Sequence, residues 1–303
     1  MKGRIFRIAA NRYVVHAENG VFSCAFTGRA KRERRHVLRL AAVGDYVEFE
    51  PSAADEGSIG EVLPRRSKLS RHDAFRPRYE QVIAANVDQL VVVHAAAQPD
   101  LSLLTVDKCT VMGEASGLAC LVCVNKLDLA DVRGSVAHYP SIGFPLVLTS
   151  AAKGAGTAAL REALRGRTSV LLGPSGVGKT SLLNALRPDF AMKVGEVSER
   201  TGEGRHTTTW VELRELEPGT LVIDTPGLEF FTLWGVEIEN LAAHFPEFVS
   251  RMPRCKFRAG CSHTREPNCA VVEALERGEI ARSRYESYVR IREDLIKKRR
   301  ELG

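Results

Sequence analysis

The sequence of 303 residues lacks any long hydrophobic run. A membrane-spanning helix needs about 20 consecutive apolar residues, so no membrane span is predicted. The N-terminal stretch, Met1–Arg7, has no apolar core of the kind that a secretion signal requires. We therefore expect a cytoplasmic protein that does not bind membranes.

Cysteine is also scarce, with seven residues in the chain. In a cytoplasmic protein, seven cysteines fit thiols or metal ligands better than a disulfide framework. The net charge of +6 and the pI near 9.0 favour a polyanionic partner, although only weakly. Hydrophobic content of 44% and charged content of 26% are ordinary for a globular protein, and the length predicts about two domains.

Short apolar segments separated by glycine dominate residues 1 to about 80, which predicts a small barrel of about five strands. A basic segment, Arg29–His36, lies between two of these strands. It is either a solvated loop or a contact to the phosphate backbone of a nucleic acid, because clustered cations release counterions when they bind one. Residues 65–86 show little periodicity and are interpreted as a basic linker.

The most informative stretch starts with a buried strand at Thr168–Leu172 and continues as Gly-x-x-x-x-Gly-Lys-Thr, the Walker A pattern. Helix-forming residues follow it as far as Pro188. Glycines let backbone N–H groups turn toward a phosphate, Lys179 is expected to reach the β- and γ-phosphates, and the Thr180 hydroxyl to bind Mg²⁺. The expected phosphate-binding residues are Gly173, Pro174, Ser175, Gly176, Val177, Gly178, Lys179, Thr180 and Ser181.

A second motif, Asn-Lys-x-Asp, follows the aliphatic strand at 119–124. Guanine presents two adjacent donors, N1–H and N2–H₂, and one carboxylate accepts both, so Asp128 is predicted to select guanine over adenine. Ser150 and Ala151, after the next strand, resemble the loop whose backbone covers the guanine O6 in GTPases. The predicted base-binding residues are Asn125, Lys126, Leu127, Asp128, Ser150 and Ala151.

The same strand carries Cys120 and Cys123, which form a C-x-x-C. Residues three apart in a strand point to opposite faces, so these two cannot share a metal and are interpreted as buried thiols.

Glycine-rich residues 188–209 are predicted to be a switch segment. One of its three consecutive threonines, for which we choose Thr208, resembles the residue that binds Mg²⁺ in the switch loops of GTPases. A buried strand then ends in Asp-Thr-Pro-Gly. Asp224 is expected on the Mg²⁺ side, and the Gly227 N–H at the γ-phosphate. The predicted magnesium ligands are therefore Thr180, Thr208 and Asp224. Residues 210–216 are interpreted as an edge strand.

The motif order is unusual, because the guanine-reading motif precedes the Walker A loop. The same three-dimensional site results if the sheet is circularly permuted. The segment after Asp-x-x-Gly then leads directly into the C-terminal region, so the nucleotide state could move that region.

The C-terminal region carries Cys255-x5-Cys261-x-His263-x5-Cys269. Three thiolates and one imidazole suit a closed tetrahedral Zn²⁺ site. Residues 270–300 are predicted to be helical. Their basic end, Lys297–Arg300, is either a solvated helix end or a second nucleic-acid contact.

Together, the permuted motifs, the basic barrel and the zinc spacing resemble the RsgA (YjeQ) family of small-ribosomal-subunit biogenesis GTPases. The resemblance implies an oligonucleotide-binding (OB) fold over residues 1–75, a circularly permuted α/β P-loop GTPase domain over 80–235, and a mostly α zinc-binding domain over 236–303. It also implies GTP hydrolysis stimulated by the small ribosomal subunit during late maturation, with rRNA as a contact. We expect a monomer.

Many GTPases place a water-orienting glutamine after Asp-x-x-Gly, but here Leu228 occupies that position. The resemblance points to His206 as the catalytic group instead, with a solvated loop histidine as the alternative. Two departures from the family are minor: a Cys255–Cys261 gap one residue longer than expected, and Thr180 in place of the usual serine.

Three other functions compete with this interpretation. A P-loop ATPase is disfavoured by residues 125–128, which match guanine. An RNA-binding protein whose nucleotide site is only a relic of the fold is disfavoured by the intact Lys179, Thr180 and Asp224. An RNA-binding protein that uses GTP only as a structural or binding switch stays open as the alternative.

Overall fold

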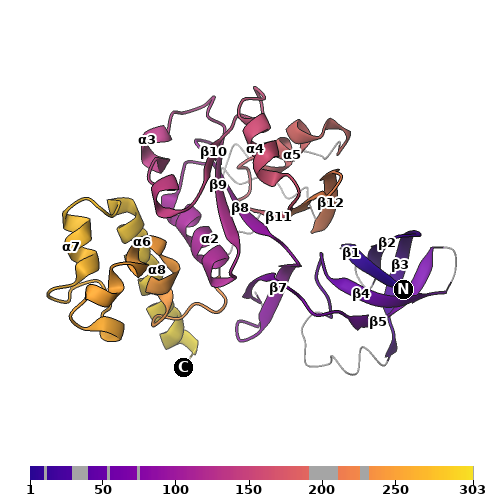
Figure 1. The fold of residues 1–303 in the computed structure, drawn as a ribbon, viewed down its shortest axis with the longest axis horizontal. Coiled ribbons are helices and arrows are strands. Elements are labelled where there is room, and N and C mark those ends of the chain that lie inside the picture. Colours follow the sequence, from indigo (N-terminus) through magenta and orange to yellow (C-terminus); the bar gives the residue numbers. More distant parts are fainter. Residues whose placement is uncertain are drawn as a thin grey trace.

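A computed structural model describes residues 1–9, 12–28, 40–52, 55–73, 76–190, 211–225 and 232–302. Figure 1 shows a strand-rich N-terminal part, a central sheet flanked by helices, and a helical C-terminal part. The strands are β1 (Lys2–Ala9), β2 (Arg12–Ala17), β3 (Gly20–Phe26), β4 (Tyr46–Pro51), β5 (Glu56–Val62), β6 (Lys68–His72), β7 (Glu80–Ala85), β8 (Gln89–Ala95), β9 (Ala119–Asn125), β10 (Leu146–Leu148), β11 (Thr168–Leu172), β12 (Glu212–Glu217) and β13 (Thr220–Asp224). The α-helices are α2 (Leu103–Ala115), α3 (Arg133–Val136), α4 (Thr157–Leu164), α5 (Lys179–Leu186), α6 (Pro246–Val249), α7 (Ala270–Glu276) and α8 (Arg282–Leu302).

Strands β1 to β5 form the predicted five-stranded barrel. Strand β1 pairs with both β2 and β4, and β3 pairs with β5, so the strands curl around one apolar interior. Alternate residues such as Ile5, Val15, Phe49 and Ile59 are buried there, as the period-two pattern requires.

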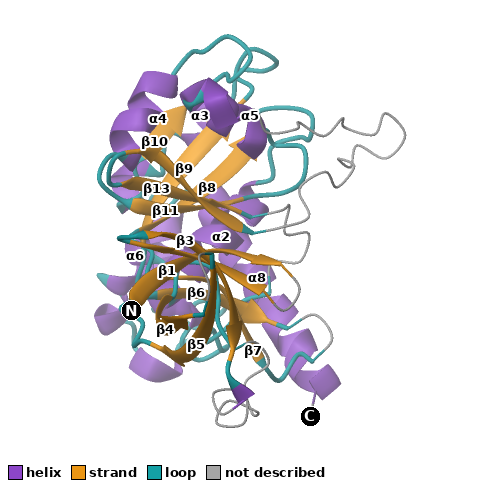
Figure 2. Cartoon of the chain, turned by 90° about the vertical axis from the view of Figure 1, so that its right-hand side faces the viewer, coloured by secondary structure: helices purple, strands orange, loops and turns teal. Residues whose placement is uncertain are grey.

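The central sheet has the strand order β10-β9-β8-β11-β13-β12, in which the first five strands are parallel and β12 is antiparallel. Helix α2 packs on one face of this sheet, and α4 and α5 pack on the other (Figures 1 and 2). Cys120 belongs to the core on the α2 face and Cys123 to the core on the α5 face. The prediction of two buried thiols on opposite faces is confirmed.

Two local predictions were wrong. Residues interpreted as a linker form an antiparallel hairpin, β6–β7, whose Leu69 and Ala84 are fully buried. Strand β12 is not an edge strand, because Arg7 of β1 pairs with Glu212 and joins the barrel to the central sheet. In both cases the segment packs against or pairs with residues that are distant in the sequence.

The C-terminal part is held to the central sheet by a buried arginine. Arg284 on α8 donates to Asp107 on α2 at 2.6 Å and to Glu247 on α6 at 2.7 Å. All three side chains are almost completely buried. Among the described residues, no helix is long and apolar enough to cross a membrane.

Candidate nucleotide site and metal centre

The Walker loop joins β11 to α5, and α5 begins at Lys179. The Lys179 ammonium donates to the carbonyls of Gly173 at 2.8 Å and Pro174 at 3.0 Å, so it lies inside the curve of the loop. Burial lowers the pKa of Lys179, and the nearby Asp224 opposes that shift. A buried cation at the start of a helix is a strong site for an anionic phosphate.

The guanine-reading motif touches this loop directly. The side-chain amide of Asn125, the last residue of β9, donates to the Val177 carbonyl at 3.1 Å. The next residue along the loop, Gly178, has a φ of +94°, and a Cβ there would lie 2.4 Å from the Asn125 amide nitrogen. Glycine is therefore required by both the backbone conformation and the close approach.

Ser150 and Ala151 each contact one residue of the predicted guanine-reading motif. The Ser150 hydroxyl donates to the Asp128 carboxylate at 2.5 Å, and this hydrogen bond is the main cause of the lowered pKa of Asp128. The Ala151 N–H donates to the Asn125 side-chain oxygen at 3.0 Å. An ionised carboxylate can accept the two donors of a guanine edge.

Thr149 is a site residue that the sequence analysis missed. Its hydroxyl donates to the Asn125 side-chain oxygen at 3.2 Å and helps to fix the orientation of that amide. Its position between strand β10 and Ser150 was the available signal.

Asp224 ends β13 beside the Walker loop and has an unusual environment. Its side chain is buried, and neither carboxylate oxygen has a hydrogen-bond partner among the described residues. Burial raises its pKa to about 6, although Lys179 and Arg214 pull in the opposite direction. Orphaned, buried carboxylate oxygens need a partner, and a hard cation such as Mg²⁺ supplies one. Asp224 thus fits the predicted magnesium role.

Several predicted site residues lie outside the described residues. They are His206, Thr208 and Gly227, together with Leu228 and the basic segment Arg29–His36.

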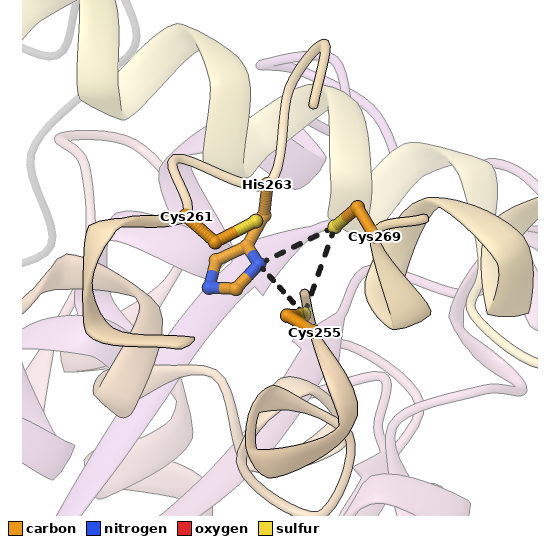
Figure 3. Close-up of side chains that lie close together, drawn as sticks. All are labelled: Cys255, Cys261, His263 and Cys269. Carbon is orange, nitrogen blue, oxygen red and sulfur yellow. Dashed lines mark hydrogen bonds between the residues drawn. The ribbon is translucent and has the colours of Figure 1, made fainter. Parts of the chain in front are cut away.

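The side chains of the four residues of the C-terminal motif lie close together, as Figure 3 shows. Their ligand atoms all lie within 4.8 Å of one another, and all four side chains are buried. His263 Nδ1 is 3.6 Å from Cys255 Sγ and 3.5 Å from Cys269 Sγ, and these two sulfurs are 3.9 Å apart. Tetrahedral Zn²⁺ with the usual bond lengths requires ligand separations of about 3.5–3.8 Å. The cluster therefore fits a metal ion.

Two tyrosine hydroxyls hold the backbone of the segment that carries the histidine of this cluster. Tyr285 donates to the His263 carbonyl at 3.0 Å, and Tyr288 donates to the Ser262 carbonyl at 2.8 Å. Both tyrosines belong to α8, so the metal centre and the long C-terminal helix form one unit. Burial raises the pKa of Cys261 to about 12, so forming its thiolate costs free energy. A bound cation would offset the cost of deprotonation by stabilising the thiolate.

The RsgA GTPase family model matches residues 62–234, more than half of the chain. The chain belongs to the RsgA GTPase family. The small ribosomal subunit biogenesis GTPase RsgA of Gemmatimonas aurantiaca is 42% identical and is covered over 93% of both chains. The corresponding protein of a Geobacillus species is 39% identical, with 97% of each chain covered.

Solved structures agree with this assignment to the RsgA family. The crystal structure of YjeQ from Thermotoga maritima has a TM-score of 0.77 and 35% identity, covering 97% of this chain and 98% of that chain. YloQ, described as a circularly permuted GTPase, has a TM-score of 0.72 and 30% identity, covering 98% and 95%. The prediction of an N-terminal barrel, a permuted GTPase domain and a C-terminal Cys/His centre is confirmed, and the protein is a GTP hydrolase.

Proposed function

We propose that this GTPase acts in late maturation of the small ribosomal subunit and that the subunit stimulates its hydrolysis of GTP to GDP and phosphate. The relatives named above carry small-subunit biogenesis in their names. The main structural support for the proposed GTP site is the hydrogen bond from the Asn125 side chain to the Val177 carbonyl, which joins the proposed base-reading motif to the phosphate loop.

We assign guanine to Asp128, with Asn125, Thr149 and Ser150 holding the surrounding loops. Residues 173–181 surround the phosphates, and Lys179 faces the charge that develops on the transferred group. The γ-phosphate also receives the Gly227 N–H in this assignment.

Magnesium is assigned to Thr180 and Asp224, with Thr208 as the switch ligand. When bound with GTP, the ion neutralises phosphate charge and positions the reacting groups. Leu228 has no polar group with which to orient the attacking water, and the resemblance to the RsgA family assigns this role to His206.

The C-terminal centre is assigned one structural Zn²⁺ held by Cys255, Cys261, His263 and Cys269. The choice of zinc rests on the donor set, since three thiolates and an imidazole suit this ion in a closed tetrahedron. Residues 1–75, 80–235 and 236–303 are proposed as the OB-fold, GTPase and zinc-binding domains of a cytoplasmic monomer. The barrel and the basic C-terminal end are the proposed rRNA contacts.

One experiment tests this function. GTP turnover is measured with purified small subunits, with large subunits and with neither. We expect slow turnover alone, about 10⁻⁴ to 10⁻² s⁻¹ as for unassisted GTPases, and faster turnover only with small subunits. Equal rates in the three samples would reject the ribosomal part, and efficient competition by ATP would reject the guanine assignment.

A further inference from the structure

An ion pair lies next to Asp224 on the face of the sheet that α5 covers. Glu212 on β12 stands directly opposite Asp224 on β13, and Arg214 stands opposite Val222. Val222 belongs to the core that includes the leucines of α5, so all four side chains share that face. Side chains directly opposite in an antiparallel pair have Cβ atoms about 4.5–5.5 Å apart, and diagonal neighbours lie within reach of long side chains. Glu212 and Arg214 are therefore both close to the carboxylate assigned to Mg²⁺.

Arg214 is held away from that carboxylate by two contacts. Its Nη2 donates to Glu212 Oε2 at 2.5 Å. Its guanidinium carbon lies 5.5 Å from the centre of the Phe190 ring, a cation–π distance. Its Nε is buried and has no hydrogen-bond partner in the part of the chain that the structure describes, so this guanidinium retains an unused donor.

Asp224 has the complementary deficit, since both of its oxygens are buried and lack partners within the described ranges of the chain. A guanidinium and a carboxylate form strong paired hydrogen bonds when they meet. If Arg214 were released from Glu212, Asp224 would be the nearby acceptor with free oxygens. Such a pair would occupy the oxygens that a cation needs and would place a positive charge beside it.

We propose that Glu212 is a positioning residue that engages Arg214 and thereby keeps the Asp224 carboxylate available to Mg²⁺. This inference rests on the proposed magnesium site. It assigns to the Glu212–Arg214 pair control of cation affinity, and no direct contact with the reacting atoms.

The test measures Mg²⁺ affinity by titrating Mg²⁺ into the full chain loaded with a fluorescent GDP analogue. Four variants are compared with the parent: E212Q, R214M, the double variant E212Q/R214M, and E215Q. Glu215 is an exposed neighbour on the same strand, so E215Q is a matched control for the loss of one negative charge. Thermal unfolding of each variant verifies folding.

We expect E212Q to bind Mg²⁺ about tenfold more weakly. A nearby opposite charge changes the proton affinity of a carboxylate by about tenfold or more, and we expect a similar effect on its affinity for a cation. The double variant should recover the affinity of the parent within about twofold, since it lacks the competing guanidinium. R214M alone should not weaken binding, and E215Q should match the parent.

Two results would overturn the inference. The first is E212Q binding Mg²⁺ as tightly as the parent. The second is a double variant as weak as E212Q, which would mean that Glu212 acts by itself. A parent that shows no Mg²⁺ binding would instead reject the magnesium site of the proposed function, so the two failures are distinguishable.

Discussion

The Asn125 side chain donates its amide hydrogen to the backbone carbonyl of Val177, across a sequence separation of 52 residues. The contact joins the carboxyl end of β9 to the phosphate loop that follows β11. Strands β9 and β11 flank β8, and all three are parallel, so the loops after β9 and β11 lie on the same edge of the sheet. Ligands of open α/β sheets bind at that edge. The two motifs therefore lie together at one edge of the sheet despite their permuted order.

Replacing Gly178 with alanine should damage this contact. The new Cβ would lie 2.4 Å from the Asn125 amide nitrogen, on a backbone with a φ of +94°. We expect GTP affinity to fall at least about tenfold, because backbone strain of this kind alone costs about 1–3 kcal/mol. Equilibrium binding of a fluorescent GTP analogue measures the effect. Gly134→Ala is the matched control, since nothing lies within 4 Å of its Cβ position and its φ is unremarkable; an equal loss in both variants would contradict the argument.

Replacing Asp128 with asparagine should change base preference. Xanthine carries a carbonyl where guanine carries the N2 amine, so its edge offers one donor and one acceptor, which a side-chain amide can match. We expect about 100-fold weaker GTP binding, since a hydrogen bond to a charged group contributes about 1.5–3 kcal/mol, and a gain in xanthosine triphosphate binding. Competition between the two nucleotides measures it. Unchanged preference would place the base elsewhere.

The chemistry of the site was predictable because each motif is contiguous. Gly173–Thr180, Asn125–Asp128 and Asp224 each lie at the carboxyl end of a buried strand, and a strand followed by a loop is visible in the sequence. The Cys/His cluster was likewise visible, since 15 residues contain all four of its members. Local spacing therefore carried both the nucleotide and the metal predictions.

The parts that the sequence did not reveal depend on distant partners. Strand β6 contains one strongly apolar residue, Leu69, so no alternation marked it, and its burial arises from packing against the core around α2. Strand β12 looked like an edge because its partner β1 lies some 200 residues earlier in the chain. Arg284 resembled any charged residue of a basic helix, yet its acceptor Asp107 is 177 residues away.

Arg284→Met should be strongly destabilising. Methionine has a similar length but would leave Asp107 and Glu247 as buried, uncompensated carboxylates. Breaking one side of a buried ion pair costs about 3–5 kcal/mol. Urea denaturation with a fluorescence readout measures the change in the free energy of unfolding. Arg290→Met on the same helix removes only an exposed pair with Glu293 and should cost less than about 1 kcal/mol; similar losses in the two variants would contradict the assignment of a buried clamp.

Removal of the C-terminal metal should unfold that centre. Four buried ligand groups converge there, and a structural zinc ion contributes on the order of 10 kcal/mol to folding. We expect one zinc per chain by atomic absorption, its loss in Cys261→Ser, and a lower thermal midpoint after treatment with a strong chelator. Cys24→Ala, in the distant barrel core, should retain the metal. Full zinc content in Cys261→Ser would show that the cluster is not the binding site.

Asp224→Asn should stabilise the nucleotide-free protein in a pH-dependent way. Burial raises the pKa of Asp224 from 3.8 to about 6, so folding favours the neutral carboxyl. The cost of burying the charge is absent below pH 4, grows as the pH rises from 4 to 6, and is complete above 6. A shift of this size corresponds to about 3 kcal/mol. Asparagine is never charged, so it should gain about that amount at pH 8 and almost nothing at pH 4.

Urea denaturation in Mg²⁺-free buffer without nucleotide at pH 4, 6 and 8 measures this gain as a difference from the parent, with Asp100→Asn as an exposed control that should change little at any pH. The same Asp224 variant should lose Mg²⁺ affinity, because an amide lacks the charge that the cation requires. The variant should therefore be more stable without nucleotide and should bind Mg²⁺ more weakly. This combination is expected when a carboxylate is buried for binding and its burial lowers the stability of the protein. A variant that is destabilised at pH 8 would instead assign Asp224 a structural role.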